Sequence, residues 1–533
     1  MASSTVAPSV DWQAFRSLFF AEPELGLSLD LSAMRLADDA FDRLADPFAR
    51  AFDDMAQLEA GAIANPDEGR QVGHYWLRAP ATAPEPAMRQ AIEETLDRVE
   101  AFAREIHRGE RTAANNELFS DLLLIGIGGS ALGPQLVADA LGHPDLDRLR
   151  PHFFDNTDPD GMERTLDGLG AHLATTLVVV VSKSGSTPET RNGLEIASAA
   201  WAARGLDLAT AAVAITGVGS HLDRRAEREG WMARFPMWEW VGGRTSVTSA
   251  VGLLPAALQG VDIRALLRGA AACDTATRRP ELRRNPAALL ALAWFEATGG
   301  RGAKDMVVLP YKDRLALFAR YLQQLVMESL GKGRDLAGNE IAQGLTVYGN
   351  KGSTDQHAYV QQLREGVENF FAVCVQVLED GGAPLEIEPR TTAGDFLRAF
   401  LLGTRQALTE AGRRALLLTL DRVDAFHLGV LIALFERAVG LYASLIRINA
   451  YHQPGVEAGK KAAAAILDLQ RRALAALAEA DAPMELDALA SALDAVDRQP
   501  TLYYLLAGLA ANGRVARHAG GQPLDSRWSA ADS

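Results

Sequence analysis

The chain has 533 residues, 48% of them hydrophobic and 23% charged, which is the composition of an ordinary soluble globular protein. That length is too great for one hydrophobic core, so two or three domains are expected. With 53 Lys and Arg against 68 Asp and Glu, the formal net charge is −15, which argues against broad nucleic-acid binding because that needs a basic surface. An acidic protein can still bind a small anion through a local group of backbone amides.

The two cysteines, Cys273 and Cys374, lie far apart in apolar surroundings and form neither a disulfide framework nor a metal-ligand spacing. We expect buried free thiols in a reducing compartment. The first residues, MASSTVAPSV, lack the basic and apolar regions of a signal peptide. The apolar runs at 121–129 and 176–182 are far shorter than the roughly 18 residues of a membrane helix. We therefore expect a cytoplasmic protein without membrane contact.

The pattern of apolar residues predicts an α/β protein with four parts. Residues 1–110 carry helical spacing, interrupted by an aromatic segment in which His74 and Arg78 fit a packed connector. Residues 111–270 and 271–469 each contain continuous apolar strands, which predict parallel sheets covered by helices on both faces.

The remaining part, residues 470–533, reads as three helices followed by a hairpin around Gly520-Gly521, an order that resembles a small winged-helix module. Its segment 481–533 has 4 Arg and Lys against 7 Asp and Glu, so DNA binding is not expected. We expect instead a structural cap or an oligomer contact.

Two strand–loop–helix units carry polar loops suited to an anion. In the first, a glycine-rich turn with Gly129 leads to Ser130 at the start of a helix, where free N–H groups favour negative charge. In the second, four valines precede a loop, and Pro188 suits the first position of the next helix. The loop side chains able to hold phosphate are Ser182, Lys183, Ser184 and Thr187. Serines also form ordinary turns, and the residues alone favour neither interpretation.

Further polar residues stand near the ends of predicted elements. Arg244 follows Gly242-Gly243 at a helix start, which suits either an anion contact or an ordinary surface arginine. His357 lies in a turn–helix segment, where a helix N-terminus would lower its pKa and where a turn-capping role is the alternative. In the helix that begins near Pro454, Gln453 and Lys460 are polar, and an exposed ion pair with Glu457 explains Lys460 equally well.

The segment 315–332 predicts a largely buried helix in which Gln324 and Glu328 lie one above the other on one face. A carboxylate on that face would lose water and resist ionisation, as a general base does. The alternative is a glutamate at a helix end that meets water or a salt bridge. Position alone does not decide between them.

Six segments between Asp121 and Leu469 occur together in a fixed order: GIGGSALGP, SKSGSTPET, WVGGRTSVTSA, QQLVMESLGK, GSTDQHAY and HQPGVEAGK. In this combination and order they resemble the glucose-6-phosphate isomerase (phosphoglucose isomerase) family. The phosphate loop SKSGST resembles the bacterial branch, whereas animal-type members have SKTFTT. Thr245 stands where many members have an aromatic residue, and residues after about 470 have no place in the common pattern.

The resemblance implies two sugar-isomerase (SIS) domains, a site between them completed across a homodimer, a sugar-phosphate substrate, and no metal or cofactor. It implies that the phosphate is held by Ser182, Ser184, Thr187 and amides near Lys183, Gly129 and Ser130. It implies that Glu328 moves the proton between C2 and C1 while Arg244 faces the enediolate. It also implies that Lys460, together with His357 from the second subunit, opens the sugar ring. Gln324 and Gln453 would bind the sugar hydroxyls.

One alternative is a sugar-phosphate sensor without catalysis. Another keeps catalysis and changes the substrate, as an isomerase that also accepts mannose 6-phosphate or as an aminosugar enzyme. A sensor needs the phosphate loop but has no use for Glu328, His357, Arg244 and Lys460 together. The presence of all four favours the enzyme.

Overall fold

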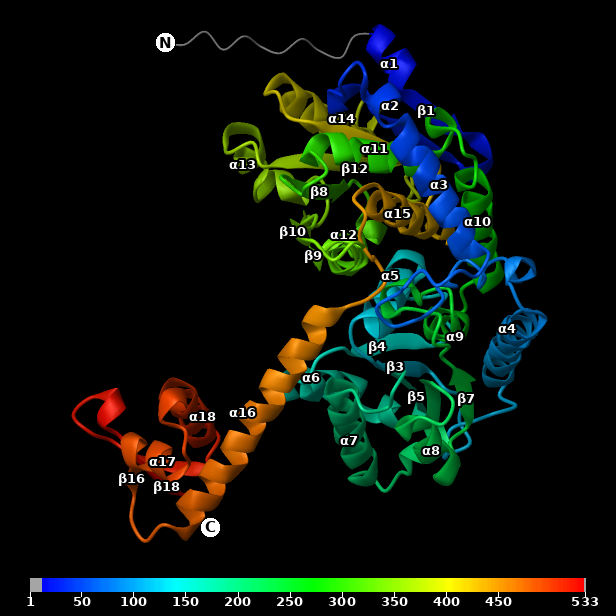
Figure 1. The fold of residues 1–533 in the computed structure, drawn as a ribbon. Coiled ribbons are helices and arrows are strands. Elements are labelled where there is room, and N and C mark those ends of the chain that lie inside the picture. The colour runs from blue at the N-terminus through cyan, green and yellow to red at the C-terminus, as the bar shows by residue number, and fades with distance from the viewer. Residues whose placement is uncertain (1–11, 532–533) are drawn as a thin grey trace. The chain divides into compact units, whose positions relative to one another are not determined.

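The computed structural model describes residues 12–531 (Figure 1). The N-terminal sequence MASSTVAPSV, on which the expectation of no signal peptide rests, lies outside them. The described residues form two compact units, one that ends at His452 and one that begins at Gln453. The first unit contains two large β-sheets with their helices, and the second contains helices and a three-stranded sheet.

The first large sheet has five strands in the order β4-β3-β5-β6-β7, and all of them run parallel. Its strands are β3 (Asp121–Ile125), β4 (Arg150–Phe154), β5 (Thr176–Ser182), β6 (Ala212–Thr216) and β7 (Ala233–Pro236). In β3, β5 and β6 every residue is buried, as predicted for strands covered on both faces. In register, Leu122 pairs with Leu177, so β3 and β5 end side by side.

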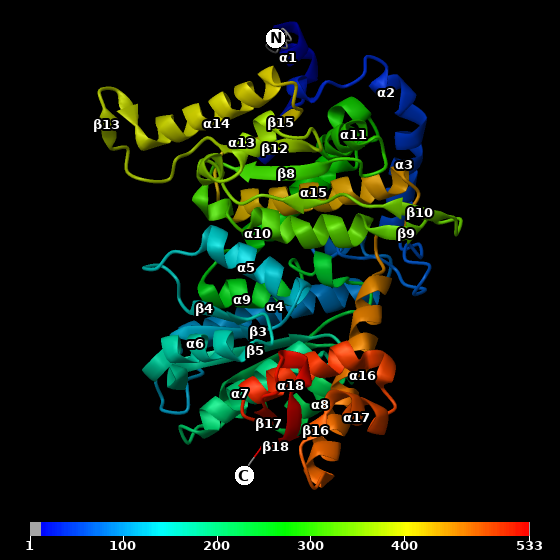
Figure 2. The same cartoon turned by 90° about the vertical axis from the view of Figure 1, so that its left-hand side faces the viewer.

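Helices cover both faces of this sheet (Figure 2). They are α5 (Gly129–Leu141), α6 (Pro159–Leu169), α7 (Pro188–Ala202), α8 (His221–Arg228) and α9 (Ala250–Gln259). Alternate residues of β3 belong to different cores: Leu122 and Leu124 pack into the large central core, whereas Leu123 and Ile125 pack with residues of α6, α7 and α8.

The second large sheet has six strands in the order β1-β2-β15-β12-β8-β11. Four of them run parallel: β8 (Asp305–Pro310), β11 (Val347–Tyr348), β12 (Phe370–Val377) and β15 (Ala415–Leu420). Its helices are α10 (Ile263–Thr277), α11 (Pro286–Thr298), α13 (Val360–Glu365), α14 (Ala393–Glu410) and α15 (Ala425–Leu445). The predicted boundary between the two α/β parts, at residues 270 and 271, falls inside α10. Both predicted cysteine thiols are buried and free.

The N-terminal segment adds two strands that its sequence did not predict. Its helices include α1 (Trp12–Leu18), α2 (Ala40–Arg43), α3 (Ala45–Glu59) and α4 (Pro86–His107). Strands β1 (Phe19–Glu22) and β2 (Leu27–Asp30) extend the second sheet in antiparallel orientation, with Leu29 opposite Leu418. A four-residue strand is too short to display a clear alternation, and its position is set by a partner distant in the sequence.

Helices α5, α9, α10 and α15 lie between the two large sheets, where they share one hydrophobic core (Figures 1 and 2). Helix α15 is long and apolar enough to cross a membrane, but 89% of its most apolar window is buried inside the protein. It is therefore a central core helix, and it holds the two sheet systems together through side chains on all sides.

The segment 315–332, predicted as one buried helix, is divided in the structure. It contains a short 3-10 turn, helix α12 (Phe318–Leu322) and a π-helix, η9 (Gln323–Glu328). Burial is as predicted for Leu322, Leu325 and Val326. The change from i→i+4 to i→i+5 hydrogen bonds widens the backbone at the residues singled out from the sequence, and π-bulges occur frequently at functional sites.

The second unit begins with α16 (Pro454–Glu479), so the boundary predicted at residue 470 falls inside this helix. It continues with β16 (Met484–Glu485), α17 (Leu486–Ala492), α18 (Gln499–Ala511), β17 (Val515–His518) and β18 (Arg527–Ala530). The last two strands form the predicted hairpin, and Trp528 packs in a core of its own. The three helices and the hairpin follow in the predicted order, whereas strand β16, which pairs with β18, was not predicted. The assignment of this part as a winged-helix module stays a prediction.

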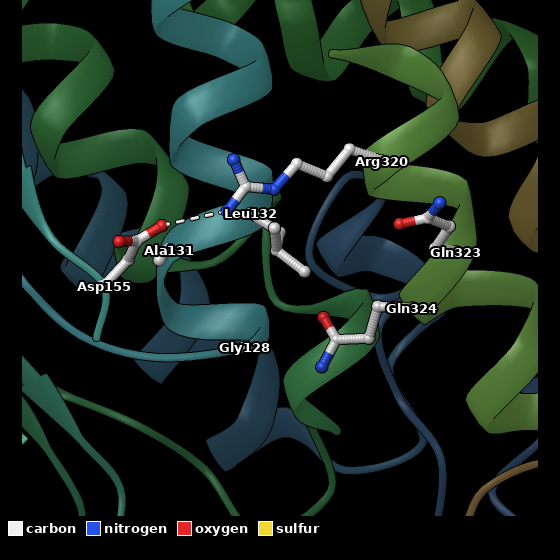
Figure 3. Close-up of a pocket in the computed structure, with 7 residues that line it drawn as sticks. All are labelled: Gly128, Ala131, Leu132, Asp155, Arg320, Gln323 and Gln324. Carbon is white, nitrogen blue, oxygen red and sulfur yellow. Dashed lines mark hydrogen bonds and ion pairs between the residues drawn. The ribbon is translucent and has the colours of Figure 1, made fainter. Parts of the chain in front are cut away.

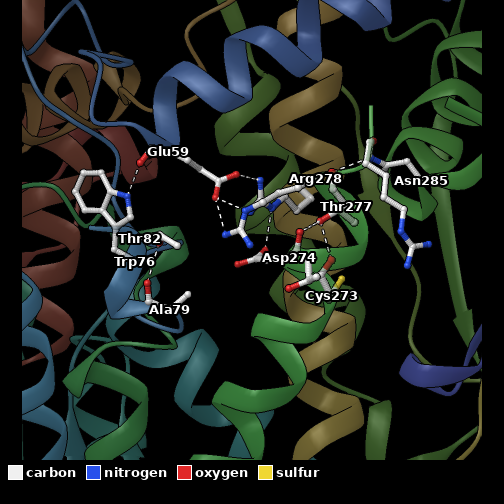
Figure 4. A network of polar contacts seen from close by, with 12 residues as sticks. Glu59, Trp76, Ala79, Thr82, Cys273, Asp274, Thr277, Arg278 and Asn285 are labelled. Carbon is white, nitrogen blue, oxygen red and sulfur yellow. Dashed lines mark hydrogen bonds and ion pairs between the residues drawn. The ribbon is translucent and has the colours of Figure 1, made fainter. Parts of the chain in front are cut away.

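A largely buried charge network joins the N-terminal segment to α10 and α15. Arg78 donates to Asp274 at 2.6 and 3.0 Å and to Glu436 at 2.5 Å. Arg437 donates to the same aspartate and pairs with Glu59, which also binds Arg278 at the C-terminal end of α10 (Figure 4). Burial raises the pKa of Glu436 to about 6, which the charge of Arg78 opposes. The segment containing Arg78 is thus a packed connector.

We predict that Arg78→Met lowers the free energy of unfolding by roughly 3–5 kcal/mol, because the buried carboxylate of Glu436 loses its cation and that of Asp274 keeps only Arg437. Arg108→Met is the matched control. Arg108 is exposed and lies 3.7 Å from Glu110, so its loss should change stability by less than about 0.5 kcal/mol. Urea unfolding of both variants measures the difference, and equal effects would contradict a structural role for the network.

Candidate active site

The site lies where the first sheet's strands end. Because β3 and β5 are parallel neighbours, the loops that follow them, residues 126–130 and 183–187, leave the same edge of the sheet. Open α/β sheets bind ligands at this edge. Each loop runs into a helix N-terminus, that of α5 at Gly129 and that of α7 at Pro188, where backbone N–H groups lack helical partners.

The turn that carries Arg244 packs directly on the first of these loops. A side chain on Gly129 would place its Cβ 2.0 Å from the carbonyl oxygen of Gly243, so the two backbones touch. Ser246 reinforces the contact by donating to the Gly129 carbonyl at 3.3 Å. Glycine is needed at position 129 for this close approach. The GGS and GGR motifs are therefore one structural feature.

Hydrogen bonds between its own hydroxyl and amide groups hold the serine-rich loop, residues 182–187, in shape. Ser182 Oγ accepts a hydrogen bond from the Gly185 amide at 3.1 Å and donates to Thr187 Oγ1 at 3.2 Å. Ser184 Oγ accepts from the Ser186 amide at 3.2 Å. Gly185 has φ +69°, and a Cβ there would meet the Leu222 amide at 2.2 Å. These contacts bring the hydroxyls of Ser182, Ser184 and Thr187 to the N-terminus of α7.

Lys183 takes a different position from its neighbours. Its Nζ donates to the main-chain carbonyl of Val241 at 2.9 Å, next to the Gly242-Gly243 turn. Burial lowers the pKa of this ammonium, and Glu239 opposes that shift. The side chain thus ties the serine-rich loop to the Arg244 turn, and a direct contact of its ammonium with a ligand stays a prediction.

Arg244 and Glu328 form a buried pair. The guanidinium Nε lies 3.4 Å from Glu328 Oε2, and the side chains are 6% and 20% exposed. The same guanidinium donates to the Ala450 carbonyl at 2.5 Å and to the His452 carbonyl at 3.4 Å. Burial lowers the pKa of Arg244, and the carboxylate of Glu328 opposes that shift. Arginine remains charged at working pH.

The pair is looser than an optimal charge-assisted hydrogen bond, which spans about 2.7–2.9 Å. Glu328 Oε2 is shielded from solvent. Glu328 therefore combines two properties of a general base: partial removal from water and a lone pair that the neighbouring cation does not fully engage.

Gln324, one turn before Glu328 on η9, faces the first glycine-rich loop. A Cβ on Gly128 would lie 3.1 Å from Gln324 Nε2. The two residues line a cavity of about 290 Å³ together with Asp155 and Arg320 (Figure 3). Arg320 lies 3.1 Å from Asp155, which follows β4. The amide of Gln324 is thus placed where the sheet edge and η9 meet.

Lys332 also belongs to this region, although nothing in its local sequence pattern pointed to it. It begins strand β9 (Lys332–Arg334), is 5% exposed, and donates to the carbonyls of Glu328 and His452. The carbonyls of residues 450–452 are a second feature that the sequence did not reveal. Main-chain acceptors have no residue type, so only the fold identifies them.

Comparison with known proteins identifies the family of the chain. The phosphoglucose isomerase family model matches residues 30–379 and 367–482. The chain belongs to the phosphoglucose isomerase family. The family predicted from the sequence is thereby confirmed.

Individual relatives cover nearly the whole chain. The glucose-6-phosphate isomerase of Geobacter sulfurreducens is 60% identical over 94% of this chain and 95% of its own length. That of Synechococcus sp. (strain JA-3-3Ab) is 59% identical over 96% and 97%. The crystal structure of the Chlamydia trachomatis glucose-6-phosphate isomerase covers 88% of this chain and 92% of its own, with a TM-score of 0.79 and 27% identity. These relatives also extend the similarity beyond the six motifs.

The contacts just described do not include three residues that the family resemblance assigns to the site. His357 is exposed at the end of the 3-10 helix η10 (Thr354–His357), in a loop that Asp355 closes through bonds from Asn350 and Tyr359. Gln453 and Lys460 belong to the second unit, and the side chain of Lys460 lies outside the described residues. Their roles stay predictions.

We predict that Gly129→Ala separates the two motif turns and lowers the free energy of unfolding by roughly 1–3 kcal/mol, because the added methyl has no room. Gly243→Ala is the matched control at the same contact. Its Cβ would meet nothing within 4 Å, so a change within about 0.5 kcal/mol is expected. Urea titration compares the two variants, and a larger loss in the control would contradict the described packing.

Proposed function

We propose that this member of the phosphoglucose isomerase family interconverts glucose 6-phosphate and fructose 6-phosphate. The observation that carries the proposal is the buried pair of Glu328 with Arg244, a base and a fixed cation 3.4 Å apart at the edge of a sheet that ends in two anion-suited loops. Aldose–ketose exchange needs both groups, whereas a sugar-phosphate sensor needs only the loops.

The proton transfer assigns one role to each member of the pair. Glu328 removes the proton from C2 of the open-chain aldose, and the electrons form a cis-enediolate with negative charge on oxygen. The same carboxyl group then returns the proton to C1, which gives the ketose. Arg244 stabilises the enediolate because its charge is fixed in place before the reaction and is shielded from water. A proton also passes from the C2 hydroxyl to the C1 oxygen, so that C1 is reduced by two electrons while C2 is oxidised by two, and no net oxidation occurs.

The substrate is held at its phosphate and hydroxyls. We assign the phosphate to the hydroxyls of Ser182, Ser184 and Thr187 with the amides of the two loops, because hydroxyls and free N–H groups converge at the N-terminus of α7. The amide of Gln324 suits a sugar hydroxyl at the sheet edge. By resemblance, Gln453 takes another hydroxyl.

Ring opening requires an acid and a base near the ring oxygen and the anomeric hydroxyl. We assign these roles by resemblance to His357 and Lys460. His357 is exposed in this chain, which suits a residue supplied to the site of a second subunit in a homodimer. We further propose that the protein acts in the cytoplasm, where sugar phosphates of central metabolism occur.

We predict that Glu328→Gln retains the fold and phosphosugar binding but lowers kcat by roughly 10²–10⁴-fold, because an amide cannot accept the C2 proton. Formation of glucose 6-phosphate from fructose 6-phosphate is followed through a coupled dehydrogenase. Glu340→Gln, at a side chain 86% exposed, is the control and should react at the wild-type rate. Near-normal turnover of Glu328→Gln would remove the basis of the mechanism.

We predict that His357→Ala slows the cyclic substrate more than an open-chain analogue, because only the former needs ring opening. Mixing the His357→Ala and Glu328→Gln proteins under conditions that exchange subunits should raise the activity on the cyclic substrate above that of either variant alone, since each mixed dimer then contains one intact site. Light scattering establishes the oligomeric state. A fully active monomer, or equal slowing of both substrates, would refute the assignment.

A further inference from the structure

Lys332 is a buried cation with an unusual set of partners. A buried ammonium is costly unless it is hydrogen-bonded or paired. Its Nζ donates to the main-chain carbonyl of Glu328 at 2.7 Å and to that of His452 at 3.0 Å. Both acceptors are neutral, so the charge of Lys332 is solvated by dipoles but is not cancelled by them.

These two bonds join separate parts of the site. The Glu328 carbonyl belongs to the last turn of η9, where carbonyls have no helical partner and a lysine is a suitable cap. The His452 carbonyl belongs to the segment 450–452, to which Arg244 also donates. Lys332 therefore joins the main chain of Glu328, the proposed base, to the segment 450–452. The same segment accepts hydrogen bonds from Arg244, the proposed stabiliser of the enediolate.

The surroundings of Lys332 weaken its ammonium form relative to water, chiefly through burial. Burial lowers its pKa from the ordinary 10.5 to about 8, and Arg244 adds to this shift. The carboxylates of Glu328 and Asp67 oppose it. His452 is the remaining titratable neighbour, and burial together with Lys332 lowers its pKa below the ordinary 6.5. A neutral side chain could donate to the carbonyl at the end of η9 without the free-energy cost of burying a charge. A function of the positive charge itself would explain why a lysine occupies this position.

We propose that Lys332 is a positioning residue of the isomerase site, whose ammonium fixes Glu328 to the segment 450–452 and maintains positive charge beside the base. This inference rests on the proposed isomerisation. Charge-assisted hydrogen bonds are roughly twice as strong as neutral ones, so loss of the proton loosens η9. It also removes a positive charge from a site that forms an anion.

Deprotonation of Lys332 is expected to change activity and stability in opposite directions. Between pH 8 and 10.5 the folded protein loses the Lys332 proton while the unfolded chain still binds it. The unfolded state then holds more protons, so the contribution of this group to the free energy of unfolding rises with pH in that window. Activity should fall in the same window. A loss of activity near pH 8 is therefore not explained by unfolding through this group.

The test compares Lys332→Arg and Lys332→Met with wild type from pH 6.5 to 9.5. Arginine keeps its charge throughout and can donate to both carbonyls. We expect Lys332→Met to lower kcat by roughly 10²-fold, the effect of a small displacement of a reacting group, with a smaller change in KM. Lys332→Arg should recover part of kcat and lose the alkaline fall near pH 8. Lys304→Met is the control, because Lys304 forms an ion pair with Glu368 away from the site. Its kcat and its pH profile should match those of wild type.

Each outcome decides the inference. An alkaline fall with the same midpoint in Lys332→Arg would assign it to another group, such as Lys460, and would overturn the proposal. An unchanged kcat in Lys332→Met would overturn it as well. Should Lys332→Met fail to fold, the pH profiles of wild type and Lys332→Arg still decide. An inactive wild type would instead refute the isomerisation, which distinguishes the two failures.

Discussion

Burial of the Arg244 guanidinium is the constraint on which the rest of the site depends. A cation removed from water needs acceptors for its N–H groups. Those acceptors include the carboxylate of Glu328 and the carbonyls of Ala450 and His452. Satisfying one side chain therefore brings together the Gly242-Gly243 turn, the end of η9 and the last residues of the first unit. The contact of Gly129 with Gly243 then fixes the first glycine-rich loop to the same group.

The parts of this arrangement that were predictable from sequence are the local ones. Continuous apolar runs identified the strands β3 and β5. The polar loops after them were recognised as suited to an anion because hydroxyls and free N–H groups occur at helix starts, with ordinary turns as the alternative. Glu328 was singled out because a glutamate stood on an apolar face. These inferences used residues within one element, where periodicity and turn composition carry the information.

The parts that were not predictable depend on contacts between distant segments. Arg244 reaches carbonyls about 206 residues later, and Lys332 reaches one 120 residues later; neither leaves a pattern in the sequence. The π-helix η9 has the same apolar residues as an α-helix would, so periodicity cannot reveal it. Strand β2 forms because β15 offers an open edge, which is a property of the assembled sheet.

The buried cations of this protein fall into two groups with different consequences. In the core, Arg78 and Arg437 donate to Asp274, and Glu59 and Glu436 complete a network of opposite charges. At the site, Lys183 and Lys332 donate to main-chain carbonyls, with carboxylates contributing less. Carbonyl dipoles solvate a cation and leave its charge in place. A protein with a net charge of −15 thereby keeps positive potential where an anionic intermediate has to form, because the field at a site depends on the nearest unneutralised groups far more than on the total.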